Sequence, residues 1–298
     1  MDVTTDSELA RAYDRARPRL VRVAYAVLGS HAEAEDVVAD MWPRLLAAHG
    51  GEPVRNVEAW AVTAVSRHAL DVLRSARHRR ETYVGVWLPE PLLADAATAP
   101  DPADRVAFRE TVSYAVLVVL ETLTPAERTA WVLHDVFGTD FNEVAVVVGR
   151  SPAAVRQLAA RARKHIAARV PRTEVDTGRH RAAVEAFTAA SRSGDVRALL
   201  AVLDPDVTLT SDGGGVVTAA RRPVEGADRV ARFLAGVAEK QPAGTTLVPV
   251  LVNGEPGLTV LDARGATVAV VSLTIADGRV VRVDMVLNPR KLPAGRDE

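Results

Sequence analysis

Apolar and polar residues alternate with a helical period in two short segments between positions 140 and 170. The second segment places its apolar residues on one helix face: Val155, Leu158, Ala159, Ala162 and Ile166. The opposite face carries Ala153, Arg156, Gln157, Ala160, Arg161 and Lys164. Gly149 suits the left-handed end of a helix, and Ser151 with Pro152 suits the start of the next one. Asp140 and Glu143 are spaced for a capping box. The pattern predicts a helix-turn-helix.

The charge of this predicted motif is strongly one-sided. No Asp or Glu occurs between Val144 and Thr173. The cations in that interval are Arg150, Arg156, Arg161, Arg163, Lys164, Arg169 and Arg172. Such a cluster can displace counterions from DNA phosphates. A solvated basic helix in a bundle is the alternative, but the tight turn and the missing acids together favour DNA binding.

Residues 6–80 have the pattern of several helices separated by turns. Pro18 is expected to begin or kink a helix, and Pro43 is awkward inside one, because proline removes a backbone hydrogen bond. Ser30 and Glu33 are spaced for a capping box. The helix after Ser30 has an acidic outer face made of Glu33, Glu35, Asp36 and Asp40. Asn56 is placed to cap a long helix whose second half is strongly basic.

Residues 81–104 form an acidic stretch rich in proline and alanine. The stretch holds five acids and no basic residue, and its four prolines exclude a continuous helix. Tyr83, Val86, Trp87 and Leu88 are too apolar for a solvated tether. We therefore predict that the segment YVGVWLPEP docks on another part of the chain.

The pattern changes after Thr173. Helices are predicted over residues 178–191, 195–203 and 226–239, with a strand over 206–212. Four further strands are predicted over residues 245–253, 258–263, 266–276 and 279–288. Asn253-Gly254 and Asp277-Gly278 are hairpin signals. Helices followed by an antiparallel meander predict an α+β domain with a curved sheet.

Composition narrows the possible functions further. The net charge is −1, so the positive charge is local. The chain has no cysteine, which excludes disulfides, thiolate metal sites and cysteine nucleophiles. The histidines are scattered, so no metal site is predicted. No apolar run reaches the ~20 residues of a membrane span, and the amino terminus lacks the pattern of a signal peptide. We expect a cytoplasmic protein with no membrane partner.

Several motifs resemble a known family. LGSHAEAEDVVADMWPRLL resembles the acidic helix of region 2 in bacterial sigma factors, and NVEAWAVTAVSRHALDVLRSARHRR resembles the promoter-melting helix of that region. The segment from Leu123 to Ile166 closely resembles region 4. These motifs are similar to those of the extracytoplasmic-function group of the sigma-70 family.

Three further motifs narrow the resemblance. YVGVWLPEP, SDGGG and NPRKL resemble signatures of the SigJ-like group, whose members carry a fused SnoaL-like C-terminal domain. Val86 stands where that group usually has proline, and Val216 stands where lysine often follows the glycines. The implied fold is multi-domain: two all-α sigma domains, the second with the helix-turn-helix, and an α+β SnoaL/NTF2-like cone. The implied boundaries are 6–80 for region 2, 81–104 for the acidic linker, 105–172 for region 4 and 175–292 for the cone.

The resemblance implies a set of binding contacts. A sigma factor binds core RNA polymerase, through the β′ clamp helices and the β flap, and promoter DNA. Glu33, Glu35, Asp36 and Asp40 would face the clamp helices, although they could also be a solvated acidic face. The −10 element would be bound by Asn56, Arg67, Arg74 and Arg77. The −35 element would be bound by Arg156, Gln157, Arg161, Arg163 and Lys164. The acidic linker would pass through the polymerase cleft.

The C-terminal domain leaves alternatives open. SnoaL-like cones resemble ketosteroid isomerase, and Asp212 and Asp284 are candidate bases, but the domain has no Tyr, Trp or Cys after residue 174 and only His180 at its edge. We therefore expect no enzymatic activity, no catalytic residue and no cofactor, with a small ligand in the cone left open. Regulation of the sigma regions by intramolecular contact is favoured, through Tyr83, Trp87, Pro89, Asp212, Asn288 and Pro289. The other classes considered are an isomerase-like enzyme carrying a helix-turn-helix and a plain DNA-binding regulator.

Overall fold

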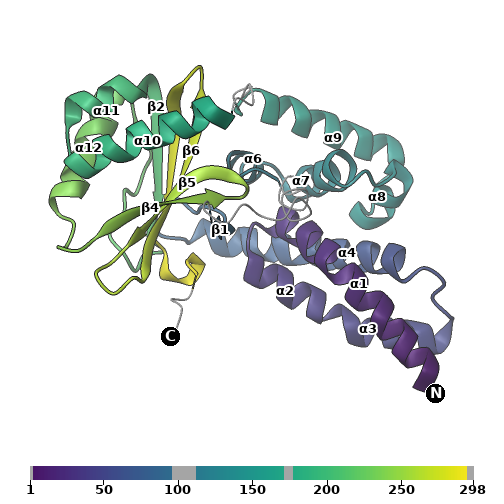
Figure 1. Ribbon diagram of the computed structural model, residues 1–298. Coiled ribbons are helices and arrows are strands. Elements are labelled where there is room, and N and C mark those ends of the chain that lie inside the picture. The colour runs from purple at the N-terminus through teal and green to yellow at the C-terminus, as the bar shows by residue number, and fades with distance from the viewer. Residues whose placement is uncertain (1–2, 96–111, 171–176, 294–298) are drawn as a thin grey trace. The chain divides into compact units, whose positions relative to one another are not determined.

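The computed structural model describes residues 3–95, 112–170 and 177–293 (Figure 1). It divides into two compact units. The first contains Met1–Glu81 and Val119–Ile166, and the second contains Thr82–Val118 and Ala167–Glu298. The chain therefore leaves the first unit after the predicted region 2 and returns to it within a later helix. In the described residues, no helix has the length and apolarity needed to cross a membrane.

The first half of unit 1 is all helical. It comprises α1 (Val3–Leu28), α2 (His31–Ala39), α3 (Met41–Gly51) and α4 (Val57–Glu81). Pro18 neither begins nor ends a helix, because α1 continues through it. Proline has no backbone N–H, so the backbone carbonyl of Asp14 lacks its helical donor. Pro18 and Asp14 are both exposed, so this carbonyl can bind water instead. Pro43 lies in the first turn of α3, where a missing backbone N–H costs little.

Tyr13 links α1 to the end of α2. Its hydroxyl donates to the backbone oxygen of Val38 at 2.5 Å, and burial raises the pKa of Tyr13 to about 12. The neutral form is favoured in the native state, so this stabilisation is complete below pH 10 and is lost between pH 10 and 12. We expect Tyr13→Phe to remove that part of the alkaline loss of stability. Urea unfolding of the wild type and of Tyr13→Phe across this pH range tests the prediction. Free energies of unfolding that fall equally steeply with pH in both proteins would contradict it.

The second half of unit 1 contains the predicted helix-turn-helix. It follows α6 (Tyr114–Leu120), α7 (Pro125–Trp131) and a π-helical turn, η1 (Val132–Val136), and consists of α8 (Phe141–Val148) and α9 (Pro152–Ala167). Gly149 ends α8 in the left-handed conformation, with φ 71°, as predicted. Asp140 caps α8 by accepting from the backbone nitrogen of Asn142, and not through the capping box expected with Glu143.

One core joins the two halves of unit 1. Val23 of α1 packs with residues of the later helices, among them Leu133, Val144 and Val155. Arg128 of α7 is almost fully buried, forms an ion pair with Glu121 and donates from Nε to the backbone oxygen of Ala26 at 3.2 Å. A buried arginine bonded to the end of α1 therefore fixes α7 against the helices of the first half of unit 1.

Unit 2 contains a seven-stranded mixed sheet with helices on one face. Its helices are α10 (Thr177–Ser193), α11 (Val196–Val202) and α12 (Ala227–Glu239), and a short 3-10 helix, η2 (Pro289–Lys291), follows the last strand. The strands are β1 (Leu93–Asp95), β2 (Leu203–Asp212), β3 (Val224–Glu225), β4 (Thr246–Val252), β5 (Glu255–Leu261), β6 (Thr267–Ala276) and β7 (Arg279–Val286). The strand order is β1-β4-β5-β6-β7-β2-β3, and β2 pairs with β7 in parallel.

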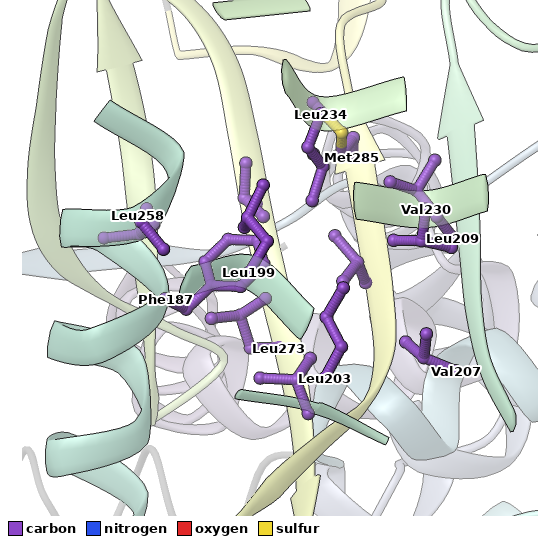
Figure 2. Close-up of a cluster of buried hydrophobic side chains, with 14 of the residues drawn as sticks. Phe187, Leu199, Leu203, Val207, Leu209, Val230, Leu234, Leu258, Leu273 and Met285 are labelled. Carbon is purple, nitrogen blue, oxygen red and sulfur yellow. The ribbon is translucent and has the colours of Figure 1, made fainter. Parts of the chain in front are cut away.

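The sheet of unit 2 has two apolar faces with different coverings. One face packs against α10, α11 and α12 around Phe187, Leu199 and Leu273 (Figure 2). A separate cluster joins Val252, Val270 and Val286 of the sheet to three residues from earlier in the chain: Leu88, Tyr114 and Val118. Residues that precede the helix-turn-helix, from Leu88 to the first helix of region 4, are therefore part of the core of the C-terminal unit.

Local signals predicted the hairpins correctly. Asn253 and Asp277 both have φ 50°, and the glycines that follow them also have positive φ. This conformation fits the turns favoured by Asn-Gly and Asp-Gly between antiparallel strands. The edge strand β1 was not predicted. It lies in the proline-rich stretch and pairs with β4, so its conformation depends on a strand about 155 residues later.

Candidate nucleic-acid interface and connector contacts

The exposed face of α9 is the one that the sequence predicted. Val155, Ala159 and Ala162 are fully buried, whereas the cationic side is exposed. The exposed predicted residues are Arg156, Gln157, Arg161, Arg163 and Lys164. The second helix of a helix-turn-helix presents such a face to the major groove.

Three of these cations already contact side chains of neighbouring helices. Arg161 pairs with Glu127 at 2.9 Å and Arg163 pairs with Asp135 at 2.5 Å. The guanidinium of Arg156 lies over the Phe141 ring. The stretch without acids therefore has carboxylates beside it from α7 and η1. Exposed ion pairs contribute little to stability, so these arginines can exchange a carboxylate for a phosphate at small cost.

The residues predicted to bind the −10 element have different surroundings. Asn56 accepts from the backbone nitrogen of Ala59 at 3.0 Å, so it caps α4. Arg67 donates from Nε and Nη2 to the backbone oxygen of Val146 in α8, at 3.1 and 2.8 Å. Arg74 pairs with Asp71 at 3.0 Å. The side chain of Arg77 lies outside the described residues. In this conformation Arg67 joins α4 to the helix-turn-helix, a contact that the sequence did not predict.

The acidic face of α2 is only partly free of internal contacts. Glu35 forms an ion pair with Arg17 and lies 3.9 Å from His31. Asp40 lies 3.5 Å from His68 of α4. Asp36 is exposed, and Glu33 is partly buried. Asp36 and Asp40 thus offer the most accessible carboxylates of the four.

In unit 2, Asp212 at the end of β2 gathers several donors. Asp212 is fully buried and accepts from the Tyr83 hydroxyl at 2.6 Å and from the backbone nitrogen of Leu88 at 2.9 Å. It also accepts from the backbone nitrogen of Gly214 at 2.9 Å and pairs with Lys291 at 2.7 Å. A buried carboxylate with four donors is well compensated for its loss of hydration.

Lys291 completes this arrangement. Its Nζ donates to the backbone oxygen of Leu88 at 2.6 Å and lies 3.8 Å from the centre of the Trp87 ring. Asn288 donates from Nδ2 to the Tyr83 hydroxyl at 2.9 Å. Burial, and next the hydrogen bond to Asp212, raise the pKa of Tyr83 well above its usual range. We call this set the Asp212 cluster: Tyr83, Trp87, Leu88, Asp212, Asn288 and Lys291.

The cluster brings together most of the contacts predicted for YVGVWLPEP. Tyr83, Trp87, Asp212 and Asn288 are members, and the backbone oxygen of Pro89 accepts from Tyr114 at 2.8 Å. Pro289 is exposed and begins η2. Lys291 was missed, although it is one of only three lysines and lies within the NPRKL motif.

Close packing explains why glycine stands at position 214 of the SDGGG motif. Gly214 has φ 65°, and a Cβ atom there would lie 2.5 Å from the side chain of Asn288. Only glycine allows the loop and Asn288 to approach this closely. Val216, which follows the glycines, is strongly exposed.

Both candidate isomerase bases are buried carboxylates that are already bonded to other side chains. Asp212 belongs to the cluster, and Asp284 is buried against Arg282 with Nε–oxygen distances of 2.7 and 2.9 Å. Burial raises the pKa of Asp284, and the charge of Arg282 opposes that shift. Among the described residues, no group of three or more His, Asp or Glu side chains is arranged to hold a metal ion.

Comparison with known families defines the class. Residues 12–79 match Sigma-70 region 2, residues 113–166 match Sigma-70, region 4, and residues 184–287 match the SnoaL-like domain. Two helical sigma regions followed by a SnoaL-like α+β domain define a sigma factor with a fused C-terminal domain. Sigma factors are not enzymes; they bind core RNA polymerase and promoter DNA.

Individual relatives define the family more closely. The chain is 40% identical over 288 residues to ECF RNA polymerase sigma factor SigJ of Mycobacterium tuberculosis, covering 94% of this chain and 91% of that protein. It is 34% identical to the probable ECF RNA polymerase sigma factor SigI of the same species, covering 97% of each. The crystal structure of the M. tuberculosis SigJ protein superposes with a TM-score of 0.76 and 37% identity, covering 95% of this chain and 97% of that one. The chain belongs to the extracytoplasmic-function (ECF) sigma factors and is SigJ-like.

Proposed function

We propose that this sigma factor is restrained in cis by its C-terminal unit, which acts through the connector, residues 82–118. The observation that carries the proposal is the Asp212 cluster. It fastens the start of the connector to the end of β2 and to η2 through a buried ion pair and several hydrogen bonds. The pairing of β1 with β4 and the burial of Tyr114 add two further attachments.

The connector follows region 2 in the sequence and ends within α6, the first helix of region 4. While both its ends are fastened to one sheet, the distance between residues 82 and 118 is fixed. A released connector of this length could span roughly 120 Å if extended. Regions 2 and 4 must reach two separate promoter elements, and here they share a core and the bond from Arg67 to Val146. Release of the connector would therefore allow the two regions to separate.

The proposal uses the polymerase and DNA contacts predicted from the sequence. The acidic face of α2 would bind the β′ clamp helices, and the released connector would enter the polymerase cleft. Region 4 would bind the β flap and the −35 element, and the basic half of α4 would bind the −10 element. The protein would act in the cytoplasm, where core polymerase and promoters are found.

Lys291→Met tests the restraint in the full-length chain. The variant removes the charge that bonds Asp212 and Leu88 but keeps an apolar side chain of similar length beside Trp87. We expect several-fold more transcript from this variant than from the wild type in reactions with core polymerase. Arg290→Ala, which changes an exposed neighbouring cation, serves as the control and should match the wild type. Unchanged or lower transcription by Lys291→Met would contradict restraint through this cluster.

Arg156→Ala tests the DNA-binding face of α9. Arginine can bind a guanine edge through two hydrogen bonds, so we expect a loss of about 1–3 kcal/mol of discrimination at a single −35 position. Holoenzyme binding to DNA libraries randomised over the −35 segment measures this loss. Arg15→Ala changes an exposed cation on α1 and provides the control. Base preferences that are the same in Arg156→Ala and the wild type would remove Arg156 from the reading residues.

A further inference from the structure

Arg156 does not lie freely on the surface of α9. Its guanidinium carbon lies 5.4 Å from the centre of the Phe141 ring, which belongs to the first residue of α8. This distance is within the range of a cation–π interaction, in which the negative face of the ring attracts the cation. The contact links the exposed face of the second helix to the start of the first.

The ring of Phe141 is itself held in place. It stacks on the ring of His134, with 3.7 Å between ring centres and 25° between the planes. Nδ1 of His134 lies 3.0 Å from the backbone oxygen of Thr139, which can only accept, so the histidine donates from that nitrogen. Phe141 also packs at the edge of the core of unit 1. The aromatic surface under Arg156 is therefore fixed by η1, by the turn and by the core.

A second feature of the same turn favours this position of Arg156. Asp140 accepts hydrogen bonds from the backbone and side-chain nitrogens of Asn142, both at 2.7 Å. The backbone bond from Asn142 lowers the pKa of Asp140, and the positive charge of Arg156 contributes to that shift. The negative charge of Asp140 therefore attracts the same guanidinium that contacts the ring.

We infer that Phe141 is a positioning residue for promoter recognition, since it holds Arg156 in the orientation needed to read one base of the −35 element. The inference rests on the proposed role of Arg156. A bidentate contact to guanine requires the plane of the guanidinium to be oriented, and a free arginine side chain must lose rotamer freedom to reach that orientation. A ring that restricts the side chain before binding reduces this loss.

The test uses holoenzyme assembled from core polymerase and full-length chain. The probe is a double-stranded DNA library randomised over the −35 and −10 segments. In Phe141→Leu, which keeps an apolar side chain at the edge of the core but removes the ring, we expect about a two- to fivefold weaker preference for the base read by Arg156. Phe141→Tyr keeps the ring and should retain the wild-type preference. Binding to core polymerase should be unchanged in both variants.

A double-mutant cycle separates positioning from a general structural role. If Phe141 acts through Arg156, Phe141→Leu changes no base preference once Arg156→Ala is present. A further loss in that background, or a loss at other positions, overturns the inference. So does a wild-type profile for Phe141→Leu when Arg156→Ala alters one position. If Arg156→Ala itself alters no position, the proposed role of Arg156 has failed, and the inference about Phe141 fails with it.

Discussion

Arg128→Ala is expected to lower the free energy of unfolding of the sigma regions by about 3 kcal/mol, the scale found when one partner of a buried ion pair is removed. The guanidinium of Arg128 is 1% exposed, so the alanine variant leaves the carboxylate of Glu121 and the backbone oxygen of Ala26 without their donor. It also leaves a void in the interior between α1 and α7. Because these contacts join regions 2 and 4, both regions should lose stability together.

Urea unfolding followed by far-ultraviolet circular dichroism measures the effect. Arg163→Ala is the matched control, because its pair with Asp135 is exposed and such pairs contribute less than about 1 kcal/mol. A loss for Arg128→Ala as small as that for Arg163→Ala would mean that the buried pair does not stabilise the joined regions.

Asp212→Ala is expected to release the connector and to destabilise unit 2 by about 3 kcal/mol, because Lys291, which is only partly exposed, would lose its counter-charge. The variant removes the acceptor for Tyr83, for Lys291 and for the backbone nitrogens of Leu88 and Gly214. Four donors left without this acceptor should affect the connector before the helix-covered face of the sheet is affected.

Hydrogen exchange at the Leu88 amide measures this release, since that amide has Asp212 as its acceptor. We expect its exchange to become much faster in Asp212→Ala, while amides in the centre of β6 stay protected. Asp206→Ala, on an exposed position of the same strand, provides the control. Slow exchange at Leu88 in Asp212→Ala would show that the remaining contacts hold the connector without Asp212.

The sequence predicted best the features that depend on neighbouring residues. Gly149, Ser151 and Pro152 located the turn of the helix-turn-helix, and the burial of Val155 and Ala159 follows from their spacing. The two hairpins of unit 2 were likewise predicted from adjacent residues, Asn253-Gly254 and Asp277-Gly278. Pro18 does not begin a helix, which was one of its two predicted roles, because an exposed proline can remain inside a helix that is held by packing along its length.

The features that the sequence missed depend on distant partners. β1 exists only because β4 provides its hydrogen bonds, and proline-rich segments give no strand signal of their own. The bond from Arg67 to Val146 and the contact of Arg156 with Phe141 depend on how helices pack. Lys291 could have been found from its motif and from the rarity of lysine in this chain, but its buried partner could not.

The position of the connector also has a consequence for synthesis of the protein. Leu88, Tyr114 and Val118 leave the ribosome long before Val270 and Val286, the strand residues that cover them. At 5–20 residues per second, the apolar strip stays uncovered for roughly ten to thirty seconds. A nascent molecule therefore passes through an interval in which both sigma regions are complete, while the sheet that would restrain them has not yet been translated.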